Sequence, residues 1–97
     1  MKERIYISGP ITGCKNNNYD AFWKVENKLI FEGFEVINPL TLCKNIDDYK
    51  ECMKLDIRAL TYCDSIYMLP NWKQSKGACI EHAVALAIGL KVIDYGE

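Results

Sequence analysis

Apolar residues follow two different spacings along this chain, and the alternation between them predicts its elements. Residues 4–8, RIYIS, are mostly β-branched or aromatic, which is typical of a buried strand, and the glycines and proline of GPITG end it. Apolar residues then recur at helical spacing from Phe22 to Ile30. An asparagine precedes this helix as a candidate N-cap, and Gly33 is placed to end it.

The same pattern of strand, loop and helix repeats through the rest of the chain. Asp47 or Asp48 is placed to cap the second long helix. Alternating strands and helices predict right-handed crossovers and a parallel sheet. The expected fold is a small doubly wound α/β fold, flavodoxin-like or Rossmann-like, with about four to five parallel strands and helices on both faces, in a single domain over residues 1–97. The further elements expected are strands at 34–37, 65–69 and 91–94 and helices at 49–62 and 75–89.

Composition limits the kinds of partner. The chain is 49% hydrophobic and 26% charged, as in soluble globular proteins, and its net charge of −1 leaves no excess of cations for binding a nucleic acid polymer. No run approaches the ~20 apolar residues that span a bilayer, so no membrane partner is expected. The five cysteines are odd in number and lack C-x-x-C, which indicates reduced thiols in a cytoplasmic protein. The single histidine, His82, has no partner at metal spacing and is interpreted as structural, so neither a metal nor a cofactor is expected.

The fold predicts where a ligand would bind. In doubly wound sheets, ligands bind beyond the carboxyl ends of the strands, near the point where the strand order reverses. The segments that follow predicted strands are SGPITG, NPLTL and LPNWKQSKG. GPITG lacks G-x-x-x-x-G-K-[ST] and G-x-G-x-x-G, which disfavours mononucleotide NTPases and dinucleotide dehydrogenases. The segments supply the candidate substrate-binding residues Ser8, Gly9, Ile11, Gly13, Asn38, Trp72, Ser75 and Gly77.

Two carboxylates lie where apolar residues would be expected. At about 100° per residue, Asp56 shares the helical stripe of Met53, Ile57 and Leu60. Glu81 lies in a helix of alanine, valine, leucine and isoleucine that offers it no wholly polar face. An ionised carboxylate is rarely buried unless it is paired, so each residue is either a catalytic candidate or a structural group. The structural alternatives are a loop contact for Asp56 and pairing with a lysine or tyrosine for Glu81.

The start of the last helix is a candidate anion site. Ser75 and Gly77 lie where free backbone N–H groups and the positive end of the helix dipole attract anions, although S-x-G alone is weakly specific. Glu81 follows Ser75 by six residues, roughly 9 Å along a helix. That separation is comparable with the distance from a nucleotide's 5′-phosphate to the far side of its ribose.

Several aromatic residues are candidates for stacking on a base or closing the pocket, although aromatics in a small α/β protein more often belong to the core. Trp72 is the strongest of them, because it lies in a loop between a proline and a helix cap. The others are Tyr6, Tyr19 and Tyr67.

Four stretches, in this order, resemble the nucleoside 2-deoxyribosyltransferase superfamily, which includes deoxynucleoside monophosphate N-glycosidases. The similarity is greatest to a branch of short bacterial and phage proteins. The matching stretches span most of the chain: IYISGPITG at 5–13, KLDIRAL at 54–60, CDSIYMLPNW at 63–72 and SKGACIEHAVALAIG at 75–89.

The resemblance implies roles for individual residues. It makes Glu81 the nucleophile that attacks the anomeric carbon and Asp56 the group that assists it and the departing base. It places Tyr6 against the nucleophile and Asp64 at the base end of the site. It also implies that the backbone from Gly9 to Gly13 forms the loop around the sugar and phosphate. Ser75 and Gly77 would hold the 5′-phosphate.

The expected function is therefore cleavage or transfer at the N-glycosidic bond of a (deoxy)nucleoside 5′-monophosphate or nucleoside, through a covalent glycosyl-glutamate intermediate. The alternative is a protein that binds or sequesters nucleotides without catalysis. The alanine-rich face of the last helix makes a homodimer or higher homo-oligomer plausible under either function.

Overall fold

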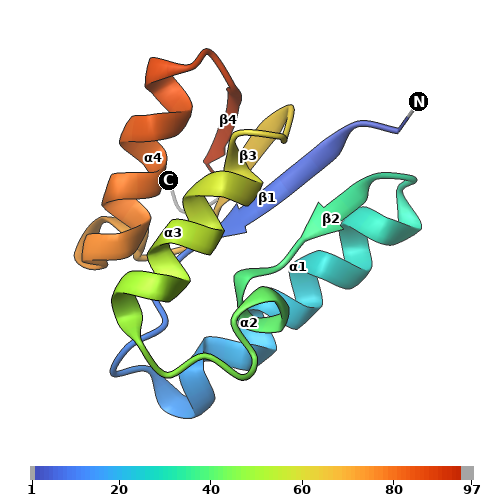
Figure 1. The fold of residues 1–97 in the computed structure, drawn as a ribbon. Coiled ribbons are helices and arrows are strands. Elements are labelled where there is room, and N and C mark those ends of the chain that lie inside the picture. Colours follow the sequence, from blue (N-terminus) through green and yellow to red (C-terminus); the bar gives the residue numbers. More distant parts are fainter. Residues whose placement is uncertain (1, 95–97) are drawn as a thin grey trace.

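A parallel four-stranded sheet in the order β2-β1-β3-β4 forms the centre of the computed structural model, which describes residues 2–94 (Figure 1). Each neighbouring pair of strands is parallel. The strand order reverses between β1 and β3, as in a doubly wound sheet. The strands are β1 (Arg4–Ser8), β2 (Glu35–Ile37), β3 (Ser65–Met68) and β4 (Lys91–Asp94).

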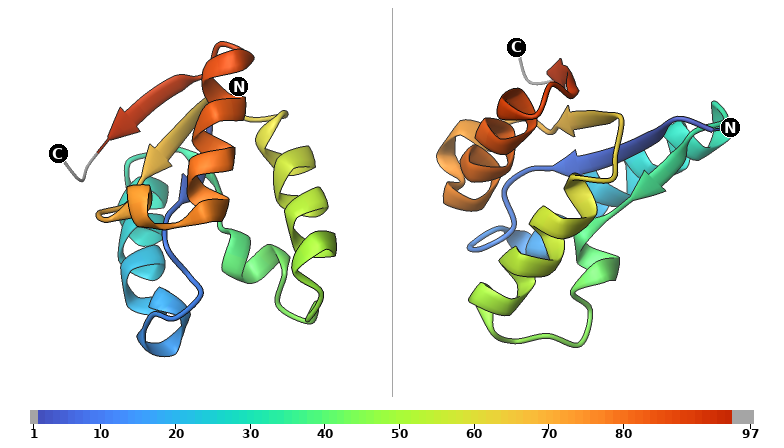
Figure 2. Two further views of the ribbon diagram at one scale, coloured as in Figure 1. Left: turned by 90° about the vertical axis from the view of Figure 1, so that its left-hand side faces the viewer. Right: turned by 45° about the horizontal axis from the view of Figure 1, so that its top comes forward.

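Helices cover both faces of this sheet (Figures 1 and 2). Helix α1 packs on one face, and α3 and α4 pack on the other. The predicted α/β fold class is thus confirmed. The helices are α1 (Tyr19–Phe31), α2 (Pro39–Leu42), α3 (Tyr49–Leu60) and α4 (Lys76–Ala87), with the 3-10 helices η1 (Lys15–Asn18) and η2 (Trp72–Gln74). In the described part of the chain, no helix has the length and apolar character needed to cross a membrane.

The side chains of β1 point alternately into the two cores, as strand geometry requires. Ile5 and Ile7 pack with Phe22 of α1. Tyr6 points to the opposite face and belongs to the core under α3 and α4. Ser8, two residues further on, shares the face of Tyr6. This alternation places two hydroxyl groups beneath the helices that carry Glu81 and Asp56.

Three of the predicted helix boundaries follow from local chemistry. Gly33, with φ +98°, adopts the left-handed conformation just after α1. The Asp48 carboxylate accepts a hydrogen bond from the Lys50 N–H at the start of α3. The Ser75 hydroxyl accepts one from the Ala78 N–H at the start of α4.

Asn18 is the N-cap residue of α1, as predicted, but the expected side-chain cap is not formed. Asn18 has φ +61° and its side chain makes no capping bond. Its amide Nδ2 instead donates to the Pro10 carbonyl at 2.9 Å, so Asn18 braces the loop after β1. Asn16 and Asn17 also have positive φ, which produces a left-handed turn that apolar periodicity cannot reveal.

Gly9 is required by a close approach at the carboxyl end of β1. A Cβ at this position would lie 2.7 Å from Cβ of Leu69. We therefore expect Gly9→Ala to lower the free energy of unfolding by roughly 1–3 kcal/mol, because two central strands must move apart. Urea denaturation measures this change. Thr12→Ala, at an exposed position of the same loop, should stay within about 0.5 kcal/mol of the parent. Equal stability of the Gly9 variant would contradict the close contact.

Candidate active site

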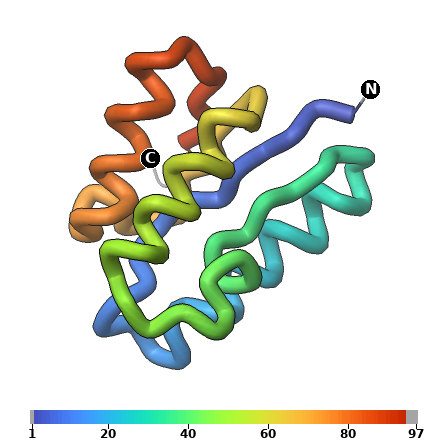
Figure 3. The backbone as a smooth tube through the Cα atoms, viewed as in Figure 1, coloured from blue at the N-terminus to red at the C-terminus, as the bar shows by residue number. Residues whose placement is uncertain are grey.

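A pocket of about 1120 Å³ opens beyond the carboxyl ends of β1 and β3. Three segments distant in sequence form it: the loop after β1, the chain from α2 into α3, and the first turns of α4. Figure 3 shows the first two segments, in blue and green, gathered at one end of the molecule. The volume is sufficient for a nucleoside monophosphate. The residues that line it include Gly9, Ile11, Tyr19, Cys43, Tyr49, Cys52, Met53, Asp56, Ser75, Lys76, Gly77 and Glu81.

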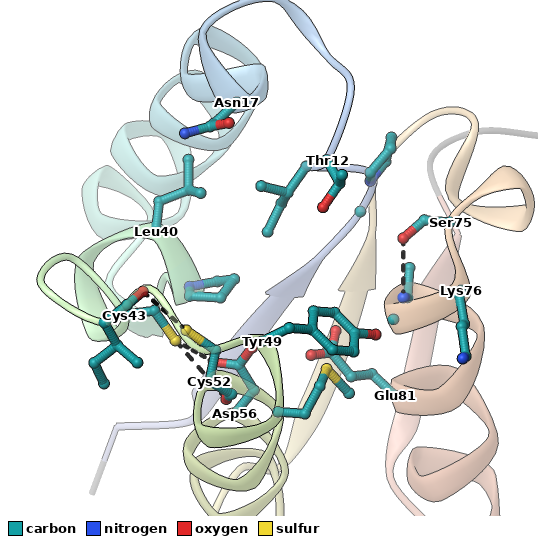
Figure 4. Close-up of a pocket in the computed structure, with 18 of the residues that line it drawn as sticks. Thr12, Asn17, Leu40, Cys43, Tyr49, Cys52, Asp56, Ser75, Lys76 and Glu81 are labelled. Carbon is teal, nitrogen blue, oxygen red and sulfur yellow. Dashed lines mark hydrogen bonds between the residues drawn. The ribbon is translucent and has the colours of Figure 1, made fainter.

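Glu81 lies at the base of this pocket, on the second turn of α4, with only 5% of its surface exposed (Figure 4). The Tyr6 hydroxyl donates to its Oε2 at 2.8 Å, and the Ser8 hydroxyl donates to its Oε1 at 2.6 Å. Both donors come from one face of β1. Two fixed hydroxyl donors orient the carboxyl group and leave its remaining lone pairs for a ligand.

The environment of Glu81 changes its acidity. Burial raises the pKa of this carboxyl group to about 7. The hydrogen bonds from Ser8 and Tyr6 favour the ionised form and oppose the rise, whereas the nearby charge of Asp56 adds to it. A carboxyl group with a pKa in the neutral range is a stronger nucleophile, once ionised, than an ordinary surface glutamate.

Asp56 is the second buried carboxyl group, with 6% of its surface exposed. It lies on the inward stripe of α3, as the helical spacing predicted. Burial raises its pKa to about 6, and hydrogen bonds from Cys43 and Tyr6 oppose that rise. The Cys43 thiol donates to its Oδ1 at 3.4 Å. Two acidic groups that titrate near neutrality therefore share one pocket.

Tyr6 lies between the two carboxyl groups. Its hydroxyl bonds Glu81, and it also acts on the acidity of Asp56. Burial, together with the negative charges of Glu81 and Asp56, holds the pKa of the Tyr6 phenol well above its usual range. Tyr6 therefore stays protonated and serves as a hydrogen-bond donor rather than a base.

The first turn of α4 forms another wall of the pocket. Ser75 and Gly77 line it, beside Lys76. The Ser75 hydroxyl already caps the Ala78 N–H, so the first-turn N–H groups of Lys76 and Gly77 are the ones that α-helix geometry leaves without an intrahelical acceptor. A Cβ on Gly77 would lie 3.4 Å from the Tyr49 hydroxyl, an ordinary contact distance, so this wall lies next to α3.

The structure brings most of the predicted site residues together. Tyr6 and Ser8 lie beneath the pocket and bond Glu81. The predicted residues that line the pocket are Gly9, Ile11, Asp56, Ser75, Gly77 and Glu81, and Tyr19 also lines it.

Asp64 and Trp72 lie away from the pocket. The prediction that Asp64 lies at the base end of the site is wrong in position, because Asp64 precedes β3 and accepts a hydrogen bond from the Arg4 N–H at 2.8 Å, at the amino ends of the strands. Trp72 is not a pocket residue either. It is buried against His82, with ring centroids 4.3 Å apart, and its Nε1 donates to Asp94 at 3.3 Å. The contact with Trp72 accords with the structural interpretation of His82.

Asn38, Gly13 and Tyr67 also lie outside the pocket lining. The side-chain oxygen Oδ1 of Asn38 caps α2 by accepting from the Leu40 N–H, and the side-chain Nδ2 donates to Glu26. Both ends of its side chain are thus used in the fold. Gly13 has φ +82° in the loop after β1. Tyr67 is buried in the core beside α1, so its ring does not face the pocket.

Sequence reasoning missed Cys43, Tyr49 and Lys76, which line the pocket. Tyr49 could have been found, because it precedes Asp56 by seven residues on one helical face. Cys43 could not, because it follows the short helix α2, whose only sequence signal is an asparagine before a proline. Within residues 2–94, no group of three or more His, Cys, Asp and Glu side chains is arranged to hold a metal ion.

Comparison with known proteins gives one family match and similar solved structures. A family model described as "Domain of unknown function (DUF4406)" matches residues 3–94. No curated protein matches the chain. A 2-desoxiribosyltransferase from Leishmania mexicana is similar in structure, with a TM-score of 0.76 and 22% identity over 96% of this chain. The CMP N-glycosidase BcmB of Clostridium botulinum is similar with a TM-score of 0.65 and 26% identity over 95% of this chain.

Each match covers nearly all of this chain but a smaller share of the similar protein. This chain spans 63% of the Leishmania protein, less than two thirds, and 70% of the Clostridium protein. The family match covers nearly the whole described chain. The chain therefore belongs to the DUF4406 family and has the fold of the nucleoside 2-deoxyribosyltransferase-like superfamily that its sequence resembles.

Proposed function

We propose that this protein cleaves the N-glycosidic bond of a (deoxy)nucleoside 5′-monophosphate through a glycosyl ester on Glu81. The observation that carries the proposal is the buried Glu81 carboxyl group, which is oriented by two hydroxyl donors and faces a second buried acid across one pocket. The similar solved proteins, named for deoxyribosyl transfer and for CMP N-glycosidase activity, support this class of chemistry.

The pocket suggests how such a substrate would lie. The 5′-phosphate would occupy the first turn of α4, where the Lys76 and Gly77 N–H groups and the Lys76 charge attract an anion. The sugar would then lie over Glu81. The base would extend toward Asp56 and the side chains of Cys43 and Met53 beyond it.

The reaction would proceed in two steps. Ionised Glu81 attacks the anomeric carbon, the bond to the base nitrogen breaks, and its electron pair leaves with the base, which receives a proton from Asp56. Water then attacks the anomeric carbon and transfers a proton to Asp56, while the bond from that carbon to the Glu81 oxygen breaks and its electron pair returns to the carboxylate. The sugar phosphate is released, and both carboxyl groups return to their starting states. Another base in place of water would give transfer.

The test is incubation with a panel of ribo- and deoxyribonucleoside monophosphates and the matching nucleosides, with chromatographic detection of free base. Release from at least one monophosphate, and slower release from its nucleoside, is expected. Tyr6→Phe keeps the ring but removes one donor to Glu81, and should lower the rate while the fold persists. A protein that releases no base from any member of the panel would refute the proposal.

The acidities of the two carboxyl groups predict the pH dependence of the reaction. Glu81 must be ionised, and its pKa is about 7. Asp56 must be protonated, and its pKa is about 6. The product of these two fractions is a bell with bends near pH 6 and 7 and a maximum near 6.5. Measured kcat/KM should follow this bell. Asp56→Asn should keep the rise with pH but lose the alkaline fall; an unchanged alkaline fall would contradict the assigned role of Asp56.

A nucleotide binder without catalytic activity is the second candidate. It is favoured by the hydrogen bonds of Glu81, because both of its carboxyl oxygens already accept from the Tyr6 and Ser8 hydroxyls, as in a group held to bind a ribose rather than to attack it. Thermal stabilisation by a monophosphate, without release of base over long incubation, would support this candidate against the first.

A further inference from the structure

Cys43 is a pocket residue to which the proposed reaction assigns no role. It follows the last residue of α2, and its thiol donates to Oδ1 of Asp56 at 3.4 Å (Figure 4). The same sulfur lies 3.8 Å from the Cys52 carbonyl oxygen on α3. These contacts join the segment after β2 to the helix that carries Asp56.

The other donor near Asp56 is the Tyr6 hydroxyl, which Asp56 shares with Glu81. The Tyr6 hydroxyl acts on both carboxyl groups, but a phenol has one proton, and Tyr6 donates it to Glu81 at 2.8 Å. The Cys43 thiol has no such competitor among the carboxyl groups of the pocket. Cys52 does not replace it, because the Cys52 thiol points to the Ile46 carbonyl at 3.5 Å.

The Cys43 thiol is suited to remain a donor. Burial and the proximity of Cys52 and Asp56 raise the pKa of this thiol well above its usual range. It therefore keeps its proton throughout the range in which Asp56 titrates. A protonated thiol can donate to an ionised carboxylate, whereas it gains little from a neutral carboxyl group.

We propose that Cys43 is a positioning residue, whose thiol holds the Asp56 carboxyl group toward the pocket and favours its ionised form. The ionisable groups that face Asp56 are Cys43, Tyr6 of β1 and Glu81 of α4. Cys43 thereby lowers the pH at which Asp56 gives up its proton, against the larger effect of burial. An effect of Cys43 on the pH dependence of base release rests on the proposed function, whereas the contact with Asp56 does not.

The experiment is an NMR titration of the Asp56 side-chain carboxyl carbon, assigned by its loss in Asp56→Asn. Removing the donor in Cys43→Ala should raise the Asp56 midpoint by roughly 0.5 to 1 pH unit. Cys43→Ser keeps a donor and should return the midpoint to the parent value or below it. Cys79→Ala is the matched control, because this exposed thiol bonds the Lys73 carbonyl and should leave Asp56 unchanged.

The role of Cys43 would be overturned if the Asp56 midpoint were the same in the parent and in Cys43→Ala. It would also be overturned if Cys43→Ser raised the midpoint as far as Cys43→Ala does. If the alanine variant fails to fold, the serine variant still decides, because a midpoint above the parent's contradicts the role. The titration needs no turnover. A shifted midpoint in a protein that releases no base would establish the contact and refute the proposed function, so the two failures are distinct.

Discussion

Replacing Glu81 by glutamine should lower the rate of base release by about a thousandfold or more, because the variant retains the shape of the side chain but loses the nucleophile. Glutamine can still bond both hydroxyls, since the Tyr6 or Ser8 hydroxyl can turn to accept from its amide. Binding of the monophosphate should therefore persist. The measurements are single-turnover release of base and nucleotide affinity by calorimetry.

The matched control for this loss is Glu51→Gln. Glu51 is an exposed carboxylate on α3, paired with Lys54 at 3.4 Å, and the substitution removes the same charge away from the pocket. Its release of base should stay close to that of the parent. Comparable activity in the Glu81 and Glu51 variants would show that Glu81 does not form the glycosyl ester.

The same Glu81→Gln substitution should stabilise the protein at alkaline pH. The folded-state pKa of Glu81, about 7, lies above its ordinary value of 4.5, so folding disfavours the ionised form. The protonated Glu81 side chain contributes fully to the free energy of unfolding below about pH 4.5, and this contribution is lost as pH rises through 7. At pH 8 the loss is roughly 3 kcal/mol, which a neutral glutamine would not suffer.

Denaturant unfolding at pH 8 and at pH 4.5 measures this effect. The variant should exceed the parent in free energy of unfolding by up to roughly 3 kcal/mol at pH 8, and the difference should close near pH 4.5. Glu51→Gln should show no such pH-dependent gain. A Glu81 variant less stable than the parent at pH 8 would mean that the hydroxyl bonds outweigh the burial of charge. Stability gained with activity lost is typical of a site maintained for chemistry.

The fold was largely predictable because its signals are local and repeated. The strand and helix spacings gave the order of the main elements, and the inward stripe of α3 placed Asp56 correctly before any contact was known. Glu81 was found because an acidic residue is unusual in a helix of apolar residues that is expected to be buried. Its bonds to Tyr6 and Ser8, more than 70 residues away, depend on how the sheet assembles.

The misplacements of Asp64 and Trp72 have different causes. The role of Asp64 rested on the family resemblance alone, whereas its place before β3 puts it at the amino ends of the strands, away from the pocket. Trp72 follows β3, yet its ring turns into the core against His82. The single domain, the cytoplasmic location and the homo-oligomer stay predictions.

The most direct test of the account is the mass of the protein itself during turnover. A 2′-deoxy-2′-fluoro nucleoside monophosphate should slow breakdown of the glycosyl ester more than its formation, so the ester would accumulate and an acid quench would trap it. The account predicts one fluorinated sugar phosphate per chain, mapped to the peptide that contains Glu81 and absent from Glu81→Gln. Release of free base by a protein whose Glu81 stays unmodified, at a rate that Glu81→Gln does not reduce, would contradict it.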